Sequence, residues 1–325
     1  MQNRTRRSWT ALAVAAGAAL GLGMAPAGAA QLTFGMSNVG LSFPFASAIA
    51  KGFQEAGAKV GARTVVLDAR GDVQKQANDI QDLIAQKVSG IVLMPLDSTV
   101  AESWVNRATA AGVKVVAVGS EIGDPNKRPI KDVYPKLVAL TTQDEVAAGE
   151  AAGKIAANLL PKSGEAKIAV IEGQAGFPEV RQRRQGFEQA LKSAGIHYKI
   201  VASQPGDWTA EKGMAACQNI LQSNPDVQLF FNESDDMVVG CARAVRAAGS
   251  HAKLIGMGGS KLAIAAIRTG QVDGTVCYKP ENLGALAFNA LYDDVTGKHE
   301  RHAAFVTYNT PGITKANLSQ CVPQW

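Results

Sequence analysis

The stretch Leu229–Gly249, LFFNESDDMVVGCARAVRAAG, contains the pattern that decides the fold. A short apolar run, 229–231, stops at the polar residues 232–236, and apolar residues then recur at helical spacing until Gly249. The pattern predicts a buried strand, a polar loop and an amphipathic helix that ends at glycine. In an open α/β sheet such a loop lies at the carboxyl edge, where ligands bind.

The same order of elements occurs a second time, at Ile91–Gly112 (IVLMPLDSTVAESWVNRATAAG), with Asp97 in the place of Asp235. Both copies continue into another strand that ends in glycine, VKVVAVGS and AKLIGMGGS. Upstream, VVLDARGDVQKQANDIQDLI is similar to VASQPGDWTAEKGMAACQNIL. The repeat predicts two related α/β lobes, and their strand-end loops converge on one cleft if the carboxyl edges of the two sheets face each other.

Strands and helices alternate along the whole chain, as expected of a parallel sheet covered by helices on both faces. We therefore predict an α/β protein with two doubly wound parallel-sheet lobes joined by a three-strand hinge. The hinge is expected where the chain crosses between lobes, near Thr142, Lys279 and Tyr308, and it allows the lobes to close over a ligand. The expected lobes are residues 31–142 with 279–306, and residues 143–278 with 307–325.

The first 30 residues have the composition of an export signal. Arg4, Arg6 and Arg7 precede an apolar run from Ala11 to Met24, and small residues lead up to Ala30. The apolar run is too short to span a bilayer. We expect a periplasmic protein whose signal peptide is cleaved near Ala30, with export by the general secretory or the twin-arginine route.

Charge and length narrow the class of partner. Removing residues 1–30 takes away three arginines and no acidic residue, which lowers the formal charge of the 325-residue chain from +5 to about +2. Such a chain lacks the basic excess of a nucleic-acid binder, and it is long enough to bury a core in each of two lobes. We expect a monomer that binds a small molecule and no nucleic acid.

The four cysteines, 217, 241, 277 and 321, match no zinc-binding spacing. In an exported protein they raise the question of disulfides. The helices that hold Cys217 and Cys241 follow successive crossovers on one sheet face, so we favour a disulfide between these two residues. Four buried free thiols remain the alternative.

Several classes of enzyme are disfavoured by missing motifs. A dinucleotide-binding dehydrogenase needs Gly-x-Gly-x-x-Gly after a strand, and Gly256, Gly258 and Gly259 lack the third glycine at that spacing. A hydrolase elbow of the type Gly-x-Ser-x-Gly is missing, and no histidine follows a predicted strand to act as a base. A repressor core shares the predicted fold but begins with a DNA-binding helix pair. We expect no catalysis, no cofactor and no metal site.

Taken together, the motifs resemble the ribose-binding family of bacterial solute receptors, which are the sugar-type substrate-binding components of ABC importers. The motifs are Phe-Pro-Phe at 43–45, QKQANDIQDLIAQKVSGIVLMPLDST, VRQRRQGFEQAL, VASQPGDW, ESDDMVVG and DGTVCYKPENLG. The resemblance implies a receptor that captures a small polyhydroxylated solute and delivers it to an ABC permease and its ATPase. A ligand-sensing partner of a chemotaxis receptor or of a sensor kinase stays open as the alternative.

The resemblance and the strand-end loops together predict the ligand-binding residues. They are Asn38, Phe43, Phe45, Ser120, Glu121, Phe177, Arg181, Trp208, Ser234, Asp235, Met257 and Tyr278. Aromatic rings of this set suit the apolar C–H faces of a sugar or polyol, and arginine and carboxylates suit its hydroxyls. For Ser234 or Asp235, capping of the following helix is the alternative.

Some neighbouring charged residues have a simpler expected role. We expect Arg183 and Arg184 to face solvent, and Asp97, Asp144 and Asp207 to cap helices. Family members that bind aldopyranoses usually have Asp-Arg where this chain has Gly119-Ser120, Asn in place of Ser234, and Phe-Asp in place of Met257-Gly258. These departures point away from ribose and galactose, and toward a smaller polyol, a cyclitol, a modified sugar or a less polar ligand.

Overall fold

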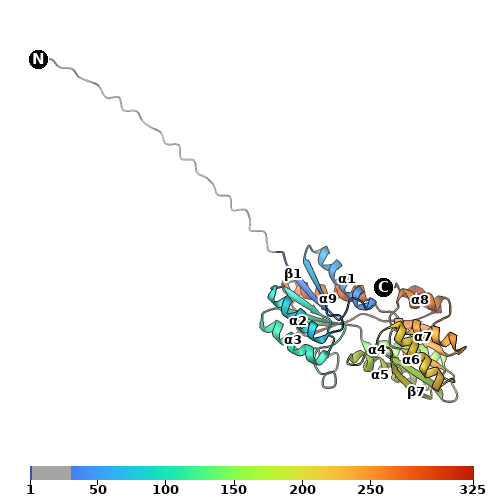
Figure 1. The fold of residues 1–325 in the computed structure, drawn as a ribbon. Coiled ribbons are helices and arrows are strands. Elements are labelled where there is room, and N and C mark those ends of the chain that lie inside the picture. The colour runs from blue at the N-terminus through green and yellow to red at the C-terminus, as the bar shows by residue number, and fades with distance from the viewer. Residues whose placement is uncertain (2–30) are drawn as a thin grey trace. The chain divides into compact units, whose positions relative to one another are not determined.

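The computed structural model describes Met1 and residues 31–325, so the expected export signal lies outside the described residues. A compact unit extends from Leu32 to Trp325 and contains two six-stranded sheets (Figure 1). The chain has the α/β architecture that the repeated pattern predicted. Each sheet and the helices that pack on it are treated below as one lobe.

The first sheet is entirely parallel and has the order β11-β5-β4-β3-β1-β2. Its strands are β1 (Thr33–Asn38), β2 (Arg63–Asp68), β3 (Gly90–Leu93), β4 (Lys114–Val118), β5 (Ala139–Thr141) and β11 (Ala304–Val306). Strand β4 shows why both faces are covered, because all of its residues after Lys114 are buried. Helices α1 (Pro44–Lys59) and α9 (Pro280–Val295) pack on one face, and α2 (Val73–Ala85) and α3 (Ser98–Ala110) on the other.

The second sheet has the order β12-β10-β9-β8-β6-β7, which repeats the first position by position. Its strands are β6 (Ala166–Glu172), β7 (Tyr198–Pro205), β8 (Leu229–Asn232), β9 (Lys253–Ile255), β10 (Gly274–Val276) and β12 (Gly312–Thr314). Helices α4 (Glu145–Leu159) and α5 (Pro178–Ser193) pack on one face. Helices α6 (Ala210–Ser223), α7 (Asp235–Ala247) and α8 (Lys261–Arg268) pack on the other, and a 3₁₀ helix, η1 (Lys315–Gln320), follows β12.

The two copies of the deciding pattern occupy equivalent places, since one forms β3 and α3 and the other β8 and α7. One strand departs from the parallel arrangement that was predicted. Strand β12 pairs antiparallel with β10, with Gly312 opposite Val276. The chain arrives from the first lobe at the carboxyl end of β10, so it must run back along that strand to join the sheet.

Three chain crossings join the lobes, between β5 and α4, between β10 and α9, and between β11 and β12. Tyr308 links all three. Its hydroxyl accepts a hydrogen bond from the Lys279 N–H at 3.0 Å and donates one to Gln143 Oε1 at 3.3 Å. Burial raises the pKa of Tyr308 far above its ordinary value, so the hydroxyl keeps the proton that it donates.

Two disulfides are present in the second lobe. One joins Cys217 on α6 to Cys241 on α7, with Cα atoms 5.4 Å apart, and this is the pair that the sequence favoured. The other joins Cys277, just after β10, to Cys321, just after η1, with Cα atoms 5.7 Å apart. Both Cα separations are ordinary for disulfides.

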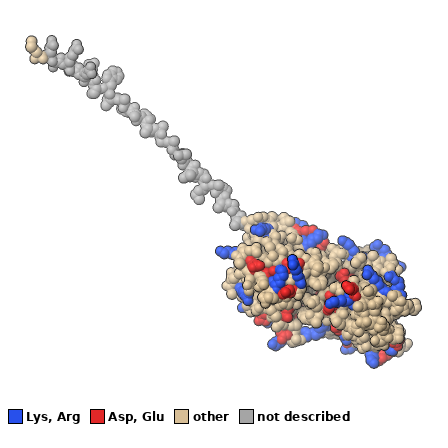
Figure 2. All heavy atoms as spheres, viewed as in Figure 1, with Lys and Arg blue, Asp and Glu red and all other residues tan. Residues whose placement is uncertain are grey.

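Charged side chains of both signs are interspersed on the face shown in Figure 2, rather than gathered by sign into a stripe. Among the described residues, no helix is both long enough and apolar enough to cross a bilayer.

Candidate ligand-binding site

A pocket lies between the two lobes and is lined by residues of both. A concave site of this kind, enclosed from two sides, is typical of sites that bind a small molecule. Its walls are mainly aromatic and apolar, with a few polar and charged groups. The aromatic lining residues are Phe43 and Phe45 from the first lobe, and Phe177, Trp208, Tyr278 and Trp325 from the second.

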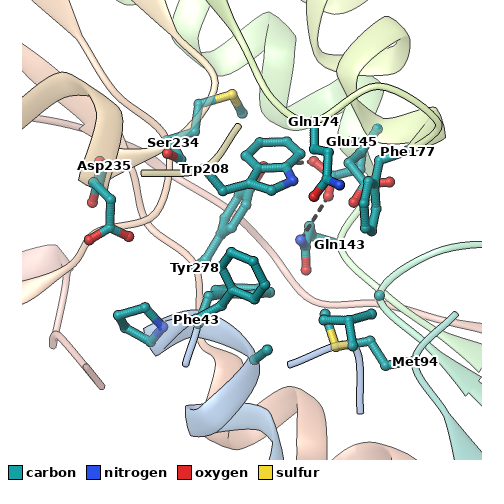
Figure 3. A pocket seen from close by; sticks show the side chains of 18 of the residues that line it. Phe43, Met94, Gln143, Glu145, Gln174, Phe177, Trp208, Ser234, Asp235 and Tyr278 are labelled. Atoms are coloured by element: carbon teal, nitrogen blue, oxygen red, sulfur yellow. Dashed lines mark hydrogen bonds between the residues drawn. The ribbon is translucent and has the colours of Figure 1, made fainter. Parts of the chain in front are cut away.

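Phe43 and Phe177 occupy equivalent places in the two lobes, each directly before a proline that begins a helix, α1 or α5. Proline is favoured at the first helical position because its fixed φ suits the helix and its missing N–H needs no partner there. Helix α5 therefore begins at Pro178, directly after the loop that carries Phe177. In Figure 3, Phe43 lies below the pocket and Phe177 at its right edge.

Trp208 forms the upper wall in Figure 3. Its backbone has a φ of +64°, a conformation that is strained for a bulky residue and that is often found at functional sites. The ring lies directly on Gly173, where an added Cβ would be 1.8 Å from the ring atom Cη2. Thr209, not the expected Asp207, caps α6, while Asp207 forms an ion pair with Lys212. Trp208 therefore stands on a strained turn in front of α6.

Arg183 lies beside Trp208, with its guanidinium 5.4 Å from the centre of that ring. Its Nε and Nη2 donate to Glu145 at 2.7 and 2.9 Å, and its Nη1 donates to the Glu233 backbone oxygen at 2.7 Å. Glu145 also accepts from the Tyr278 hydroxyl at 2.7 Å. Burial lowers the pKa of Arg183, but the Glu145 carboxylate outweighs it and raises the pKa well above the ordinary value. Arg183 is therefore a buried, permanently charged member of the pocket wall.

This arrangement corrects two expectations about the arginine cluster. Arg183 was expected to face solvent, and it is buried because it lies four residues before Phe187 on the inner face of α5. Arg181 was expected to contact the ligand, and it lies outside the pocket. Its Nη2 donates to the Pro125 oxygen at 2.8 Å, and its Nη1 hydrogen-bonds to Asn126, so it ties the rims of the two lobes together.

Ser120 and Glu121 also connect the lobes instead of lining the pocket. The Ser120 hydroxyl donates to Glu179 Oε2 at 3.0 Å, and Glu121 Oε1 accepts from Gln182 Nε2 at 2.9 Å. Burial raises the pKa of Glu121 to about 7, and the nearby Glu179 carboxylate adds to the rise. Burial likewise raises the pKa of Glu179, which lines the pocket.

The raised pKa of Glu121 predicts a pH-dependent gain in the variant Glu121→Gln. A carboxyl whose folded pKa is about 7 binds its proton more tightly in the folded than in the unfolded chain. The contribution of Glu121 to wild-type stability should therefore fall as pH rises from about 4.5 to about 7, by roughly 1 to 3 kcal/mol. The glutamine of the variant does not ionise, so its contribution to stability does not fall with pH. The variant should therefore be more stable than wild type at pH 8 and not at pH 4.5. Denaturant melts at the two pH values test this, and an equal difference at both would contradict it.

Ser234 and Asp235 lie at the left of Figure 3 and line the pocket. The Ser234 hydroxyl caps α7, accepting from the Met237 N–H at 3.3 Å. Both oxygens of the Asp235 carboxylate accept hydrogen bonds from the same lobe, one from the Ser260 N–H and one from the Thr275 hydroxyl, each at 2.6 Å. Burial raises the pKa of Asp235 to about 6. Of this pair, the serine hydroxyl is better placed to meet a ligand.

Asn38 is buried behind the pocket wall and shapes the loop that carries Phe43. Its side chain donates to the Ala46 oxygen at 2.8 Å and accepts from the Gly40 N–H at 2.9 Å. The expected caps Asp97 and Asp144 do cap α3 and α4.

Of the twelve predicted ligand-binding residues, eight line the pocket: Phe43, Phe45, Phe177, Trp208, Ser234, Asp235, Met257 and Tyr278. The sequence missed several others, namely Met94, Gln143, Glu145, Gln174, Glu179, Arg183, Asp236 and Trp325. Gln143 donates to Glu145 Oε1 at 2.7 Å, and Figure 3 shows both at the right of the pocket. A stripe of residues 179, 183, 187 and 191 along α5 could have indicated Glu179 and Arg183.

Within residues 31–325, no group of three or more His, Cys, Asp and Glu side chains is arranged to hold a metal ion. Three of the pocket carboxylates, those of Glu145, Glu179 and Asp235, accept hydrogen bonds from arginine, hydroxyl or amide donors of the protein.

Residues 34–299 match the model of the periplasmic binding protein domain family. The chain belongs to this family. It is a solute-binding protein and not an enzyme, with two lobes of the type I periplasmic binding protein fold. The ribose import binding protein of Bacillus subtilis is 33% identical over 270 residues, which cover 82% of this chain and 83% of that protein.

Two solved structures of relatives show the same fold with a ligand bound. The Caulobacter myo-inositol binding protein, bound to myo-inositol, has a TM-score of 0.81 and 26% identity, over 92% of this chain and 98% of that one. An ABC transporter solute binding protein from Mycobacterium smegmatis, with bound glycerol, has a TM-score of 0.79 and 29% identity, over 89% of this chain and 96% of that one.

Proposed function

We propose that this protein captures a small, neutral, polyhydroxylated solute between its lobes and delivers it to an ABC permease and its ATPase. The observation that supports this most is the pocket itself, in which aromatic rings from both lobes surround a few polar groups. Such rings pack on the C–H faces of a sugar, polyol or cyclitol. Arg183, whose described hydrogen bonds use three of its five donors, has donors left for hydroxyl oxygens.

The charges that line the pocket disfavour an anionic solute. Glu145, Glu179, Asp235 and Asp236 supply four carboxyl groups, and Arg183 is the single lining cation among the described residues. Arg183 is already neutralised by Glu145, through two hydrogen bonds. A phosphate or carboxylate on the ligand would therefore find no unpaired cation in the lining and would lie among carboxyl groups, which disfavours its burial.

We propose that the lobes, residues 31–142 with 279–306 and residues 143–278 with 307–325, close about the three crossings when the solute binds. The contacts of Ser120 with Glu179 and of Glu121 with Gln182 join the lobes beside the pocket, as expected of a closed form. We also propose that the protein works in the periplasm, with residues 1–30 removed on export.

A thermal-shift screen of refolded, ligand-stripped protein tests this function. The panel is glycerol, myo-inositol, D-ribose, D-allose, galactose and ribose 5-phosphate. A ligand at a hundredfold excess over Kd stabilises the folded state by about 2.7 kcal/mol, which raises Tm by several degrees. We expect such a shift with at least one neutral polyhydroxylated compound, and none with galactose or the phosphate. A shift with galactose would contradict the specificity, and no shift with any neutral compound would contradict the function.

A further inference from the structure

The segment 321–325 contributes a side chain to the pocket, in addition to those that the loops at the strand ends contribute. Figure 1 marks this end of the chain with C, near α8 and close to α1. Trp325 lines the pocket, and its ring lies 5.5 Å from that of Phe45, centre to centre, in an edge-to-face arrangement. Phe45 belongs to α1 of the first lobe, whereas the segment follows η1 in the second lobe. Trp325 therefore completes the wall at a point where the two lobes meet.

Two glycines, Gly258 and Gly259, lie where the segment 321–325 packs closely against the backbone. Gly258 has a φ of +149°, and an added Cβ there would be 2.9 Å from the ring atom Cζ2 of Trp325. At Gly259 an added Cβ would be 2.6 Å from the Cys321 sulfur. Gly258 and Gly259 were considered above as part of a dinucleotide-binding loop. In the structure, Gly258 makes room for the Trp325 ring, and Gly259 makes room for the Cys321 sulfur.

Three further contacts hold the segment in place. The Cys277–Cys321 disulfide anchors its start to the end of β10. The Lys261 N–H, at the first residue of α8, donates to the backbone oxygen of Trp325 at 2.9 Å. Gln324 Oε1 accepts from the Glu281 N–H at 2.9 Å, which satisfies a donor at the start of α9, where Lys279 provides no side-chain cap.

One group in this well-held segment has no partner. The indole Nε1 of Trp325 is buried, and no acceptor for it exists among the described residues. A buried N–H without an acceptor is costly, whereas the same N–H with a ligand oxygen as its acceptor contributes to binding. The residue that carries this donor lines the pocket, so a bound solute is a candidate for the acceptor that Nε1 lacks.

We propose that Trp325 contacts the bound solute, through its ring face and its indole N–H, and that the Cys277–Cys321 disulfide positions it for that contact. The inference rests on the proposed function and adds a ligand-selecting residue to it. An oxygen-bearing solute that reaches Nε1 gains a hydrogen bond that a solute without this oxygen lacks, so Trp325 discriminates among similar polyols.

Calorimetric titration of wild type, Trp325→Phe and Trp325→Ala with D-ribose, D-allose, myo-inositol and glycerol tests the contact. For the compound that wild type binds most tightly, Trp325→Phe should raise Kd about five- to tenfold, because it keeps a ring and loses the donor. Trp325→Ala should raise Kd further, about thirtyfold or more. Binding of both variants within twofold of wild type would overturn the inference while leaving the proposed function intact. If wild type binds none of the four compounds, the proposed function fails and the inference falls with it.

The two disulfides offer a matched comparison for the positioning role. The double variant Cys277→Ala/Cys321→Ala should raise Kd toward the value of Trp325→Ala, because the start of the segment loses its covalent anchor. The control Cys217→Ala/Cys241→Ala removes a disulfide between α6 and α7, away from the segment, and should leave Kd within twofold of wild type. Equal Kd values for the two double variants would contradict the role given to Cys277–Cys321.

Discussion

Replacing Arg183 by methionine should lower the free energy of unfolding by about 3 to 5 kcal/mol. Arg183 is 6% exposed, and its partner Glu145 is 1% exposed. Without the guanidinium, a buried carboxylate loses two charge-assisted hydrogen bonds, and the Glu233 oxygen loses one. The cost arises mainly from leaving the Glu145 charge buried and unpaired. Urea melts at pH 7 with both disulfides intact measure the change.

Two companion variants separate this cause from a general effect of losing an arginine. Arg184→Met removes the next arginine, which forms a partly exposed pair with Glu188, and should cost less than about 1 kcal/mol. Arg183→Met/Glu145→Gln removes the stranded charge and should recover part of the loss of Arg183→Met. A loss below about 1 kcal/mol for Arg183→Met, or a double variant no more stable than the single one, would contradict a buried ion pair of this kind.

Replacing Trp208 by alanine should weaken solute binding about tenfold to a hundredfold. The ring forms one wall of the pocket, and its loss removes stacking area that a smaller side chain cannot replace. Gly173→Ala should have a similar effect without touching the tryptophan, because the new Cβ would overlap the ring and push it from its place. Trp208→Phe should retain more affinity than either variant. Calorimetric titration of the four proteins with the best compound of the thermal-shift screen measures these Kd values.

The fold could be predicted from the sequence because its signal is local and occurs twice. The apolar runs at 91–94 and 229–231, the polar loops and the helical periodicity are each properties of about 20 neighbouring residues. Their repetition predicts two sheets with the same strand order, and the structure shows that order. The direction of β12 could not be predicted, because it depends on which end of β10 the chain reaches after its third crossing.

The site could be predicted only where its residues stand at strand ends. Phe43, Phe177 and Trp208 follow strands, and such positions converge on the cleft in any fold of this kind. Arg181 and Arg183 show the limit, since two arginines two residues apart on a helix point in different directions. Arg183 was expected to face solvent because it stands in a cluster of arginines, whereas its place on the buried face of α5 follows from its spacing to Phe187.

Trp325 could not be found by local pattern. Its place in the pocket depends on the Cys277–Cys321 disulfide and on close approach to Gly258, which are contacts between residues far apart in sequence. The glycines at 258 and 259 were visible, but their reason lies in the segment that packs on them. Long-range contacts of this kind appear only once the chain is folded.

The central claim is that the aromatic pocket between the lobes holds one solute. Calorimetric titration of ligand-stripped wild type and Trp208→Ala, side by side with denaturant melts of the same two proteins, tests it most directly. We predict one ligand per chain for wild type and at least a tenfold higher Kd for Trp208→Ala. The free energy of unfolding should change by no more than about 1 kcal/mol in the variant, because the ring is only partly buried. A variant that binds as tightly as wild type while losing about 3 to 5 kcal/mol of folding stability would show that Trp208 is a core residue, and would contradict the claim.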